Sequence, residues 1–253
     1  MSQLANAFSL LELDVPDKEP STSKVAVNHG KTRREGKGKG KNKIDNTSDT
    51  ITSEKENGAE SSLEVPSSHY KMPLVWIDLE MTGLDVEVDK ILEIACIVTD
   101  GNLTKMIEGP HLVIFQSKEC LDGMGEWCQT HHAASGLTEK VLQSKVSEKE
   151  AEMRVIEFVK EHVGSYTPLL AGNSVYTDYI FLKKYMPELA SLVSHVLVDV
   201  SSVKALCVRW YPKENKKAPQ KKNKHRALDD IKESIAELKY FKENIFKPPK
   251  SKK

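Results

Sequence analysis

Two carboxylates stand in an apolar segment near residue 78, and this pairing constrains the fold more than any other feature of the sequence. The segment opens with residues 74–77 (Leu-Val-Trp-Ile), typical of a buried strand, and Asp78 and Glu80 follow. Positions i and i+2 of a strand lie on one face, so both carboxylates point the same way. Burying them together is unfavourable unless a cation holds them, and hard divalent cations with oxygen ligands are the usual partner. A polar strand end that turns into solvent at Thr82 and Gly83 is the alternative.

Charge and cysteine usage narrow the class of protein. The 253 residues include 37 basic and 37 acidic side chains, so no overall field attracts nucleic acid. The four cysteines are scattered without a CxxC pair, which favours neither a zinc site nor a disulfide framework and suits a reducing compartment. No apolar run has the length of a membrane span, and the first residues lack a secretory signal. We therefore expect a soluble intracellular protein with no membrane partner.

Residues 1–70 are predicted to be a disordered leader, because they are rich in Ser, Thr, Asn, Gly, Lys and Glu and poor in apolar side chains. Residues 31–43 form a basic run, typical of a nuclear localisation signal or a nonspecific nucleic-acid arm. A solvated linker explains this run equally well. Acids at positions 12, 14, 17 and 19 argue against a mitochondrial transit peptide, so the cytoplasm or the nucleus is the expected compartment, and the mitochondrion stays open as an alternative.

Residues 71–247 are predicted to form one α/β domain, followed by a lysine-rich tail over residues 248–253. Strands expected at 74–80, 91–99 and 111–115 are joined by short turns, which favours an antiparallel meander. Helical periodicity then predicts helices over 148–163, 178–185, 202–210 and 227–246, with short strands at 169–171 and 196–200. This order of elements indicates a mixed sheet with helices packed against it.

Two further acids and a histidine complete a candidate site. Asp178 opens a predicted helix just after a short strand, and Asp230 lies in the first turns of the last helix, five residues after His225. Ordinary enrichment of acids at a helix N-terminus explains Asp229 and Asp230 as a pair. It does not explain the histidine or the two strand acids.

These motifs resemble the oligoribonucleases, the small-oligonucleotide branch of the DEDD exonucleases of the histidine subtype. The matching segments are residues 76–84 (WIDLEMTGL), 172–174 (GNS) with Asp178, 184–189 (KYMPEL) and 225–230 (HRALDD). The resemblance covers residues 72–246 and leaves the leader outside. It implies a ribonuclease H-like fold, with a mixed five-stranded sheet flanked by helices.

The resemblance also implies roles for individual residues. It makes His225 the general base that takes a proton from the attacking water. The ligands of two divalent cations, Mg²⁺ or Mn²⁺, would be Asp78, Glu80, Asp178 and Asp230. The substrate-binding residues would be Leu84 and Trp127, which sandwich the terminal base, His132 near the scissile end, and Ser174 at a phosphate. Without the resemblance, core packing is the plainer interpretation of Trp127.

The function implied by the resemblance is 3′-to-5′ degradation of very short single-stranded RNA to mononucleotides by a homodimer. One departure concerns the pair His195 and Val196, where family members often carry a tyrosine and a basic residue that reach into the partner subunit's site. A related exonuclease acting on DNA or longer RNA stays open, because two-metal cleavage needs no 2′-hydroxyl. A noncatalytic RNA-binding protein is a more distant alternative.

The six lysines of residues 213–224 would steer anionic substrates or form a solvated loop.

Overall fold

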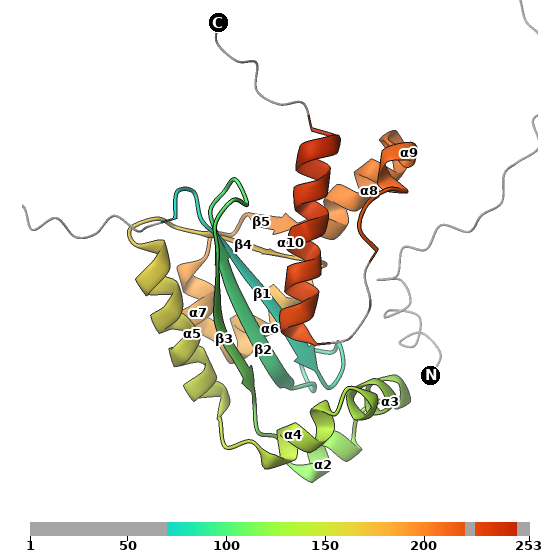
Figure 1. Cartoon of the computed structure of the whole chain (residues 1–253). Helices are drawn as coiled ribbons and strands as arrows, with labels where there is room; N and C mark the ends of the chain where they lie inside the picture. Colours follow the sequence, from blue (N-terminus) through green and yellow to red (C-terminus); the bar gives the residue numbers. More distant parts are fainter. Residues whose placement is uncertain (1–69, 221–225, 247–253) are drawn as a thin grey trace, which may run out of the picture.

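A five-stranded mixed sheet forms the centre of the molecule (Figure 1). The computed structural model describes residues 70–220 and 226–246, so the predictions for the leader, the tail, His225 and the end of the lysine loop lie outside the described residues. The sheet order is β3-β2-β1-β4-β5. The strands are β1 (Leu74–Met81), β2 (Ile91–Thr99), β3 (Met106–Val113), β4 (Leu169–Gly172) and β5 (Leu197–Asp199). The predicted α/β fold with a mixed five-stranded sheet is confirmed.

The first three strands form the predicted antiparallel meander, and β4 and β5 continue the sheet parallel to β1. The prediction placed β3 at residues 111–115, but the strand begins five residues earlier, at Met106. Its side chains are mostly half-buried or exposed because β3 is the outer strand of the meander. An edge strand of this kind carries no apolar run, and the sequence pattern therefore missed its first half.

The four predicted helices are all present, with shifts of up to two residues at their ends, and the described residues contain five further helices that the sequence pattern did not predict. Helix α5 has the expected bounds, and its N-cap Ser147 accepts a hydrogen bond from the amide of Glu150 at 3.2 Å. Helix α6 begins at Tyr176, two residues before the predicted start, and Pro187 both ends it and begins α7, since proline fits the first turn of a helix. The helices are α2 (Lys118–Asp122), α3 (Glu126–Ala134), α4 (Leu137–Gln143), α5 (Glu148–Val163), α6 (Tyr176–Tyr185), α7 (Pro187–Leu192), α8 (Val200–Trp210), α9 (Pro212–Asn215) and α10 (Ala227–Asn244).

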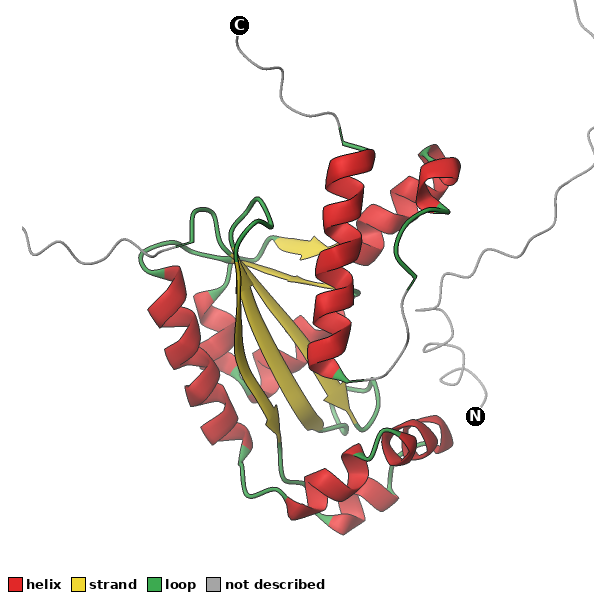
Figure 2. Ribbon diagram, viewed as in Figure 1, coloured by secondary structure: helices red, strands yellow, loops and turns green. Residues whose placement is uncertain are grey.

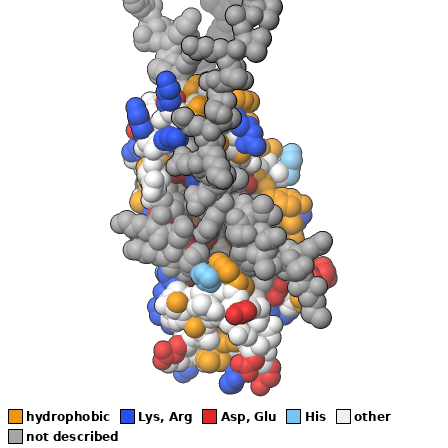
Figure 3. Space-filling model, turned by 90° about the vertical axis from the view of Figure 1, so that its right-hand side faces the viewer, with side chains coloured by type: hydrophobic (Ala, Val, Ile, Leu, Met, Phe, Trp, Pro, Cys, Tyr) orange, Lys and Arg blue, Asp and Glu red, His pale blue; other side chains and the backbone are white. Residues whose placement is uncertain are grey.

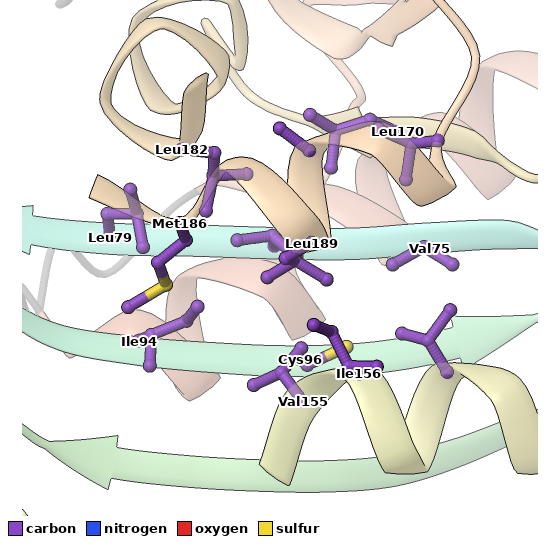
Figure 4. Packing of buried hydrophobic residues seen from close by; sticks show 14 of the residues in the cluster. Val75, Leu79, Ile94, Cys96, Val155, Ile156, Leu170, Leu182, Met186 and Leu189 are labelled. Atoms are coloured by element: carbon purple, nitrogen blue, oxygen red, sulfur yellow. The ribbon is translucent and has the colours of Figure 1, made fainter. Parts of the chain in front are cut away.

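The two faces of the sheet are covered by different helices (Figure 2). Val75 and Leu79 of β1 pack with α5, α6 and α7, and Figure 4 shows Leu79 near Leu182 of α6 and Val155 of α5 near Cys96 of β2. The alternate residue Trp76 packs instead with Ala227 and other apolar residues of α10. Because side chains alternate along a strand, Asp78 and Glu80 lie on the same face as Trp76, under the start of α10.

Helices α2, α3 and α4 form a smaller layer beyond the end of β1 (Figure 1). Their apolar side chains pack together with Leu92 of β2. This layer brings α3 next to the last residues of β1, because His132 of α3 contacts the carbonyl of Met81. The acid-bearing end of β1 therefore lies between α3 and the start of α10.

Candidate metal centre and nucleic-acid site

Three of the predicted acids converge at the end of β1. Asp78, Glu80 and Asp230 each offer a carboxylate oxygen, and these atoms lie within 4.8 Å of one another. The two strand acids share a face because of their spacing, and α10 adds Asp230 because its first turn crosses that face. All three side chains are half-buried. The arrangement fits a hard divalent cation, which prefers carboxylate oxygens as ligands.

The fourth predicted acid, Asp178, reaches the same strand from the other side. Its Oδ1 accepts a hydrogen bond of 2.9 Å from the amide of Leu79, which lies between the two strand acids. Strand β4 pairs with β1 only as far as Trp76, so among the described strands none pairs with the later backbone of β1 on that side. Helix α6 follows β4 directly and carries Asp178 into this position. Asp178 is almost fully buried and is not one of the three acids within 4.8 Å.

The electrostatics of the acids favour a bound cation. Burial raises the pKa of Glu80 to about 8, and the neighbouring charges of Asp230, Glu93 and Asp178 act in the same direction. Burial also raises the pKa of Asp178 to about 7, although the hydrogen bond from Leu79 opposes the shift. Ionised carboxylates crowded in a region that excludes water repel one another, and a divalent cation removes that penalty.

Glu93 of β2 was not among the predicted site residues, yet it is a buried acid that lies opposite Glu80 in the sheet register. Its carboxylate accepts hydrogen bonds of 2.7 Å from Nη2 of Arg226 and from Nε2 of His111. Burial raises the pKa of Glu93, but these hydrogen bonds outweigh burial and hold that pKa below its ordinary value. The sequence signal that could have pointed to Glu93 is a single acid inside a predicted strand, residues 91–99, that is otherwise mostly apolar.

A second missed residue, Asp199, holds the turn that carries Ser174. Asp199 Oδ1 accepts hydrogen bonds from the amides of Ser174, at 3.0 Å, and Ser201, at 2.9 Å. The hydroxyl of Ser174 lies 3.2 Å from that of Ser201. Ser174 has a φ of 55°, a left-handed conformation that is uncommon outside glycine and that Asp199 stabilises. The sequence signal was an Asp inside the short strand predicted over residues 196–200, whereas in the structure Asp199 is the N-cap of α8.

The loop that carries Leu84 is closed by Asp89. One carboxylate oxygen of Asp89 accepts a hydrogen bond from the hydroxyl of Thr82, and the other accepts one from the amide of Asp85, each at 2.8 Å. A Cβ on Gly83 would lie 2.4 Å from this carboxylate, so the loop needs glycine there. Leu84 is half-buried between these two anchors. The local hydrogen bonds therefore order the segment that follows the metal-site strand.

Helix α3 carries the other two predicted substrate residues. His132 is buried, and its Nε2 donates a hydrogen bond of 2.8 Å to the carbonyl of Met81, while its Nδ1 lies 4.0 Å from Glu80. Trp127 packs against the apolar core of the α2–α4 layer, which is the contact that the core-packing interpretation of this residue expects. Its ring also stacks on His131, with centroids 3.8 Å apart. The site thus brings His132 next to the acids and places Trp127 one helical turn before the histidine pair.

Comparison with known proteins decides the family. The sequence model of the exonuclease family matches residues 75–238. An oligoribonuclease of Arabidopsis thaliana is 68% identical over 200 residues, which are 79% of this chain and 89% of the relative. The chain belongs to the oligoribonuclease family. The resemblance inferred from the motifs is confirmed, and the range of the exonuclease match contains every acid of the site.

Other oligoribonucleases match the same domain. The mitochondrial oligoribonuclease of Homo sapiens is 50% identical over 174 residues, 69% of this chain and 73% of the relative. That of Pasteurella multocida is 50% identical over 175 residues, 69% of this chain and 95% of the relative. Membership of an exonuclease family, together with the acidic cluster, implies dependence on a divalent metal.

Solved structures show the same fold in a more distant exonuclease. The zinc-bound complex of E. coli exonuclease I with single-stranded DNA superposes with a TM-score of 0.51 at 15% identity. The match covers 69% of this chain and 41% of that one, so it supports the fold alone. In residues 70–220 and 226–246, no helix has both the length and the apolar character needed to span a membrane.

Proposed function

We propose that this chain is a 3′-to-5′ exoribonuclease that degrades very short RNA oligonucleotides to mononucleotides. One observation carries the proposal. The carboxylates of Asp78, Glu80 and Asp230 converge within 4.8 Å, with Asp178 beside them, in a chain that is 68% identical to a known oligoribonuclease. Such an acid set is suited to metal-assisted cleavage of a phosphodiester.

We propose Mg²⁺ or Mn²⁺ as the cofactor, with two ions held by Asp78, Glu80, Asp178 and Asp230. These all-oxygen ligands match the preference of both metals. When bound, the ions lower the pKa of the attacking water and stabilise the charge that develops on the leaving 3′-oxygen. Four carboxylates and two divalent cations have a combined charge near zero, so the site would not repel the anionic substrate.

The chain's own side chains would perform the remaining steps. His225, proposed as the general base, would take the proton from the attacking water; it lies outside the described residues, directly before Arg226. Leu84 and Trp127 would hold the terminal base between them, an interaction that tolerates any base because every base has a π-face. We assign His132 and Ser174 to the phosphates near the scissile end. The site would therefore select for a free 3′ end rather than for sequence.

We also propose that the protein works as a homodimer. The C-terminal end of α8 supports this proposal, because Leu206, Trp210 and Tyr211 are large apolar side chains that are 43–65% exposed there. At His195 and Val196, the chain lacks the family's tyrosine and basic residue. Contacts from the partner subunit to the 5′ end of the substrate would therefore differ from those of its relatives. Light scattering of the full chain would measure the oligomeric state.

For the compartment, we propose the cytoplasm or the nucleus. The relative from Homo sapiens is named mitochondrial, which is the alternative, and the basic run of residues 31–43 fits a nuclear localisation signal.

Exposed Lys213, Lys216 and Lys217 lie at α9 and just after it, and the view in Figure 3 shows basic side chains on its upper part. We propose that these lysines steer short anionic substrates towards the site.

Degradation of end-labelled RNA tests the function directly. RNA of two, five and twenty nucleotides would be incubated with Mn²⁺ and the wild type, Asp230→Ala or the matched control Asp229→Ala. We expect rapid loss of the shortest RNA, abolished by Asp230→Ala and retained in Asp229→Ala. Equal attack on long RNA or on DNA would instead assign the chain to a broader exonuclease. Absence of cleavage at any length would favour the noncatalytic RNA-binding alternative.

A further inference from the structure

Glu93 is a buried acid that lies on the same face of the sheet as the metal-site acids but is not one of the proposed ligands. It has no exposed surface and is directly opposite Glu80 in the register of β1 and β2. We propose that Glu93 is a positioning residue that, through Arg226, sets where Asp230 lies relative to Asp78 and Glu80. This inference rests on the proposed function, because it concerns the same acidic site.

The contacts of Glu93 hold the start of α10. One carboxylate oxygen accepts a hydrogen bond of 2.7 Å from Arg226 Nη2, and the other lies 3.4 Å from both Arg226 Nε and the amide of Ala227. Ala227 is the first residue of α10, so the carboxylate also meets the positive end of the helix. His111 of β3 donates a hydrogen bond of 2.7 Å to the same oxygen that accepts from Arg226 Nη2, which holds the carboxylate within the sheet. We call Glu93 and Arg226 the α10 clamp.

The backbone of Arg226 connects the α10 clamp to the metal site. Its amide donates a hydrogen bond of 3.1 Å to Oδ2 of Asp230, and its carbonyl accepts one of 3.0 Å from the amide of Asp230. Asp230 is therefore hydrogen-bonded to the backbone of Arg226, whose side chain binds Glu93. A shift of Arg226 would move the carboxylate of Asp230 away from Asp78 and Glu80, and displacements of about 1 Å are enough to impair catalysis strongly.

Stability alone does not explain a charged pair at this position. Buried ion pairs contribute little net stability compared with apolar residues of similar volume. The negative charge of Glu93 also acts on Glu80, whose pKa it raises. Helix α10 has another ion pair to the sheet, in which Lys232 lies 2.8 Å from Glu108 of β3, but both side chains are more than a third exposed. The α10 clamp differs from that pair because Glu93 has no exposed surface, Arg226 is only 21% exposed, and the clamp is hydrogen-bonded to Asp230.

The test compares Glu93→Gln with the matched control Glu108→Gln. Glutamine keeps the shape of the side chain but removes the charge that binds Arg226. We expect Glu93→Gln to raise the Mn²⁺ dissociation constant, measured by electron paramagnetic resonance, by about 10- to 100-fold, the usual effect of losing a residue behind a metal ligand. On a two-nucleotide RNA with saturating Mn²⁺, kcat should fall while KM stays within about twofold, because the base contacts are untouched. Glu108→Gln should leave all three quantities unchanged.

Arg226→Gln and the double variant give an independent measurement, which also serves if Glu93→Gln does not fold. If the two residues act as a unit, the double variant loses no more Mn²⁺ affinity than the worse single variant. Additive losses, or an unchanged dissociation constant in a folded Glu93→Gln protein, would overturn the proposal. If the wild type cleaves no RNA, the proposed function fails, but the Mn²⁺ dissociation constants still decide the role of the α10 clamp.

Discussion

The amide of Leu79 donates a hydrogen bond of 2.9 Å to Oδ1 of Asp178, and so ties the N-terminal end of α6 to the middle of the metal-site strand. The bond lies between Asp78 and Glu80 along β1. Asp178 is almost fully buried. Its carboxylate has two roles, and a substitution can remove one of them without the other. It satisfies a backbone amide of the strand, and it brings the fourth negative charge to the site.

Substitution of Asp178 should separate structure from catalysis. Asp178→Asn keeps an oxygen that accepts the hydrogen bond from Leu79 but removes the charge. We expect the urea midpoint of Asp178→Asn to stay near that of the wild type while Mn²⁺-dependent cleavage falls at least about 100-fold, because the charge of a proposed ligand is lost. Asp178→Ala should also lose about 1–3 kcal/mol of stability, since a buried amide is left unpaired. Equal stability of the two variants would contradict this account of the hydrogen bond.

The raised pKa values predict how pH affects the metal-free protein. The pKa of Glu80 is about 8 in the folded state against an ordinary value of 4.5, and that of Asp178 is about 7. Between about pH 5 and about pH 8 the folded state therefore holds more protons on these two side chains than the unfolded state does. The stability of the metal-free protein falls as pH rises through this range. Melting temperatures in EDTA should decrease over this window, and Mg²⁺ should restore them most at high pH.

Glu80→Gln is the control for the pH prediction. The variant has no proton to lose at this position, so its melting temperature in EDTA should fall less between pH 5 and pH 8 than that of the wild type. Affinity for Mg²⁺ in the wild type should rise over the same range, because the cation displaces protons from the carboxylates. A melting temperature in EDTA that rises with pH in the wild type would contradict the assigned pKa shifts.

The ring stack between Trp127 and His131 predicts graded effects on substrate binding. If Trp127 holds the terminal base, Trp127→Ala removes a base stack of about 1–3 kcal/mol and should raise KM by about 5- to 150-fold. His131 packs on the indole at 3.8 Å, so His131→Ala should raise KM by less, through a looser indole. Steady-state kinetics on a two-nucleotide RNA would measure both. An unchanged KM in Trp127→Ala would leave core packing as the role of this residue.

Steering by the exposed lysines near α9 should depend on salt. Replacing Lys213, Lys216 and Lys217 with Gln should lower kcat/KM at low salt and make its decrease with added salt shallower, because long-range attraction is screened. The control replaces three exposed lysines elsewhere: Lys140, Lys145 and Lys160. The same salt dependence in both triple variants would show that the lysines near α9 are only a solvated surface.

Local patterns predicted most of the elements. Strand β2 and helix α5 have the bounds expected from their apolar periodicity. The errors lie where tertiary packing decides. The first half of β3 has no apolar pattern because it forms the outer edge of the meander, and α6 begins at Tyr176 because the turn at Ser174 is fixed by Asp199. No local signal reports a partner from another strand.

The sequence alone determined that Asp78 and Glu80 share a face, because alternation along a strand is a local property. Its motifs also identified the family and proposed four acids for the site, three of which the structure brings within 4.8 Å. Only the tertiary structure decided how these acids meet, since α6 reaches β1 beyond the end of β4 and α10 crosses the opposite face. It alone revealed the contact between Glu93 and Arg226, which are 133 residues apart. A contact of that separation depends on how whole elements pack, and no short stretch of sequence encodes it.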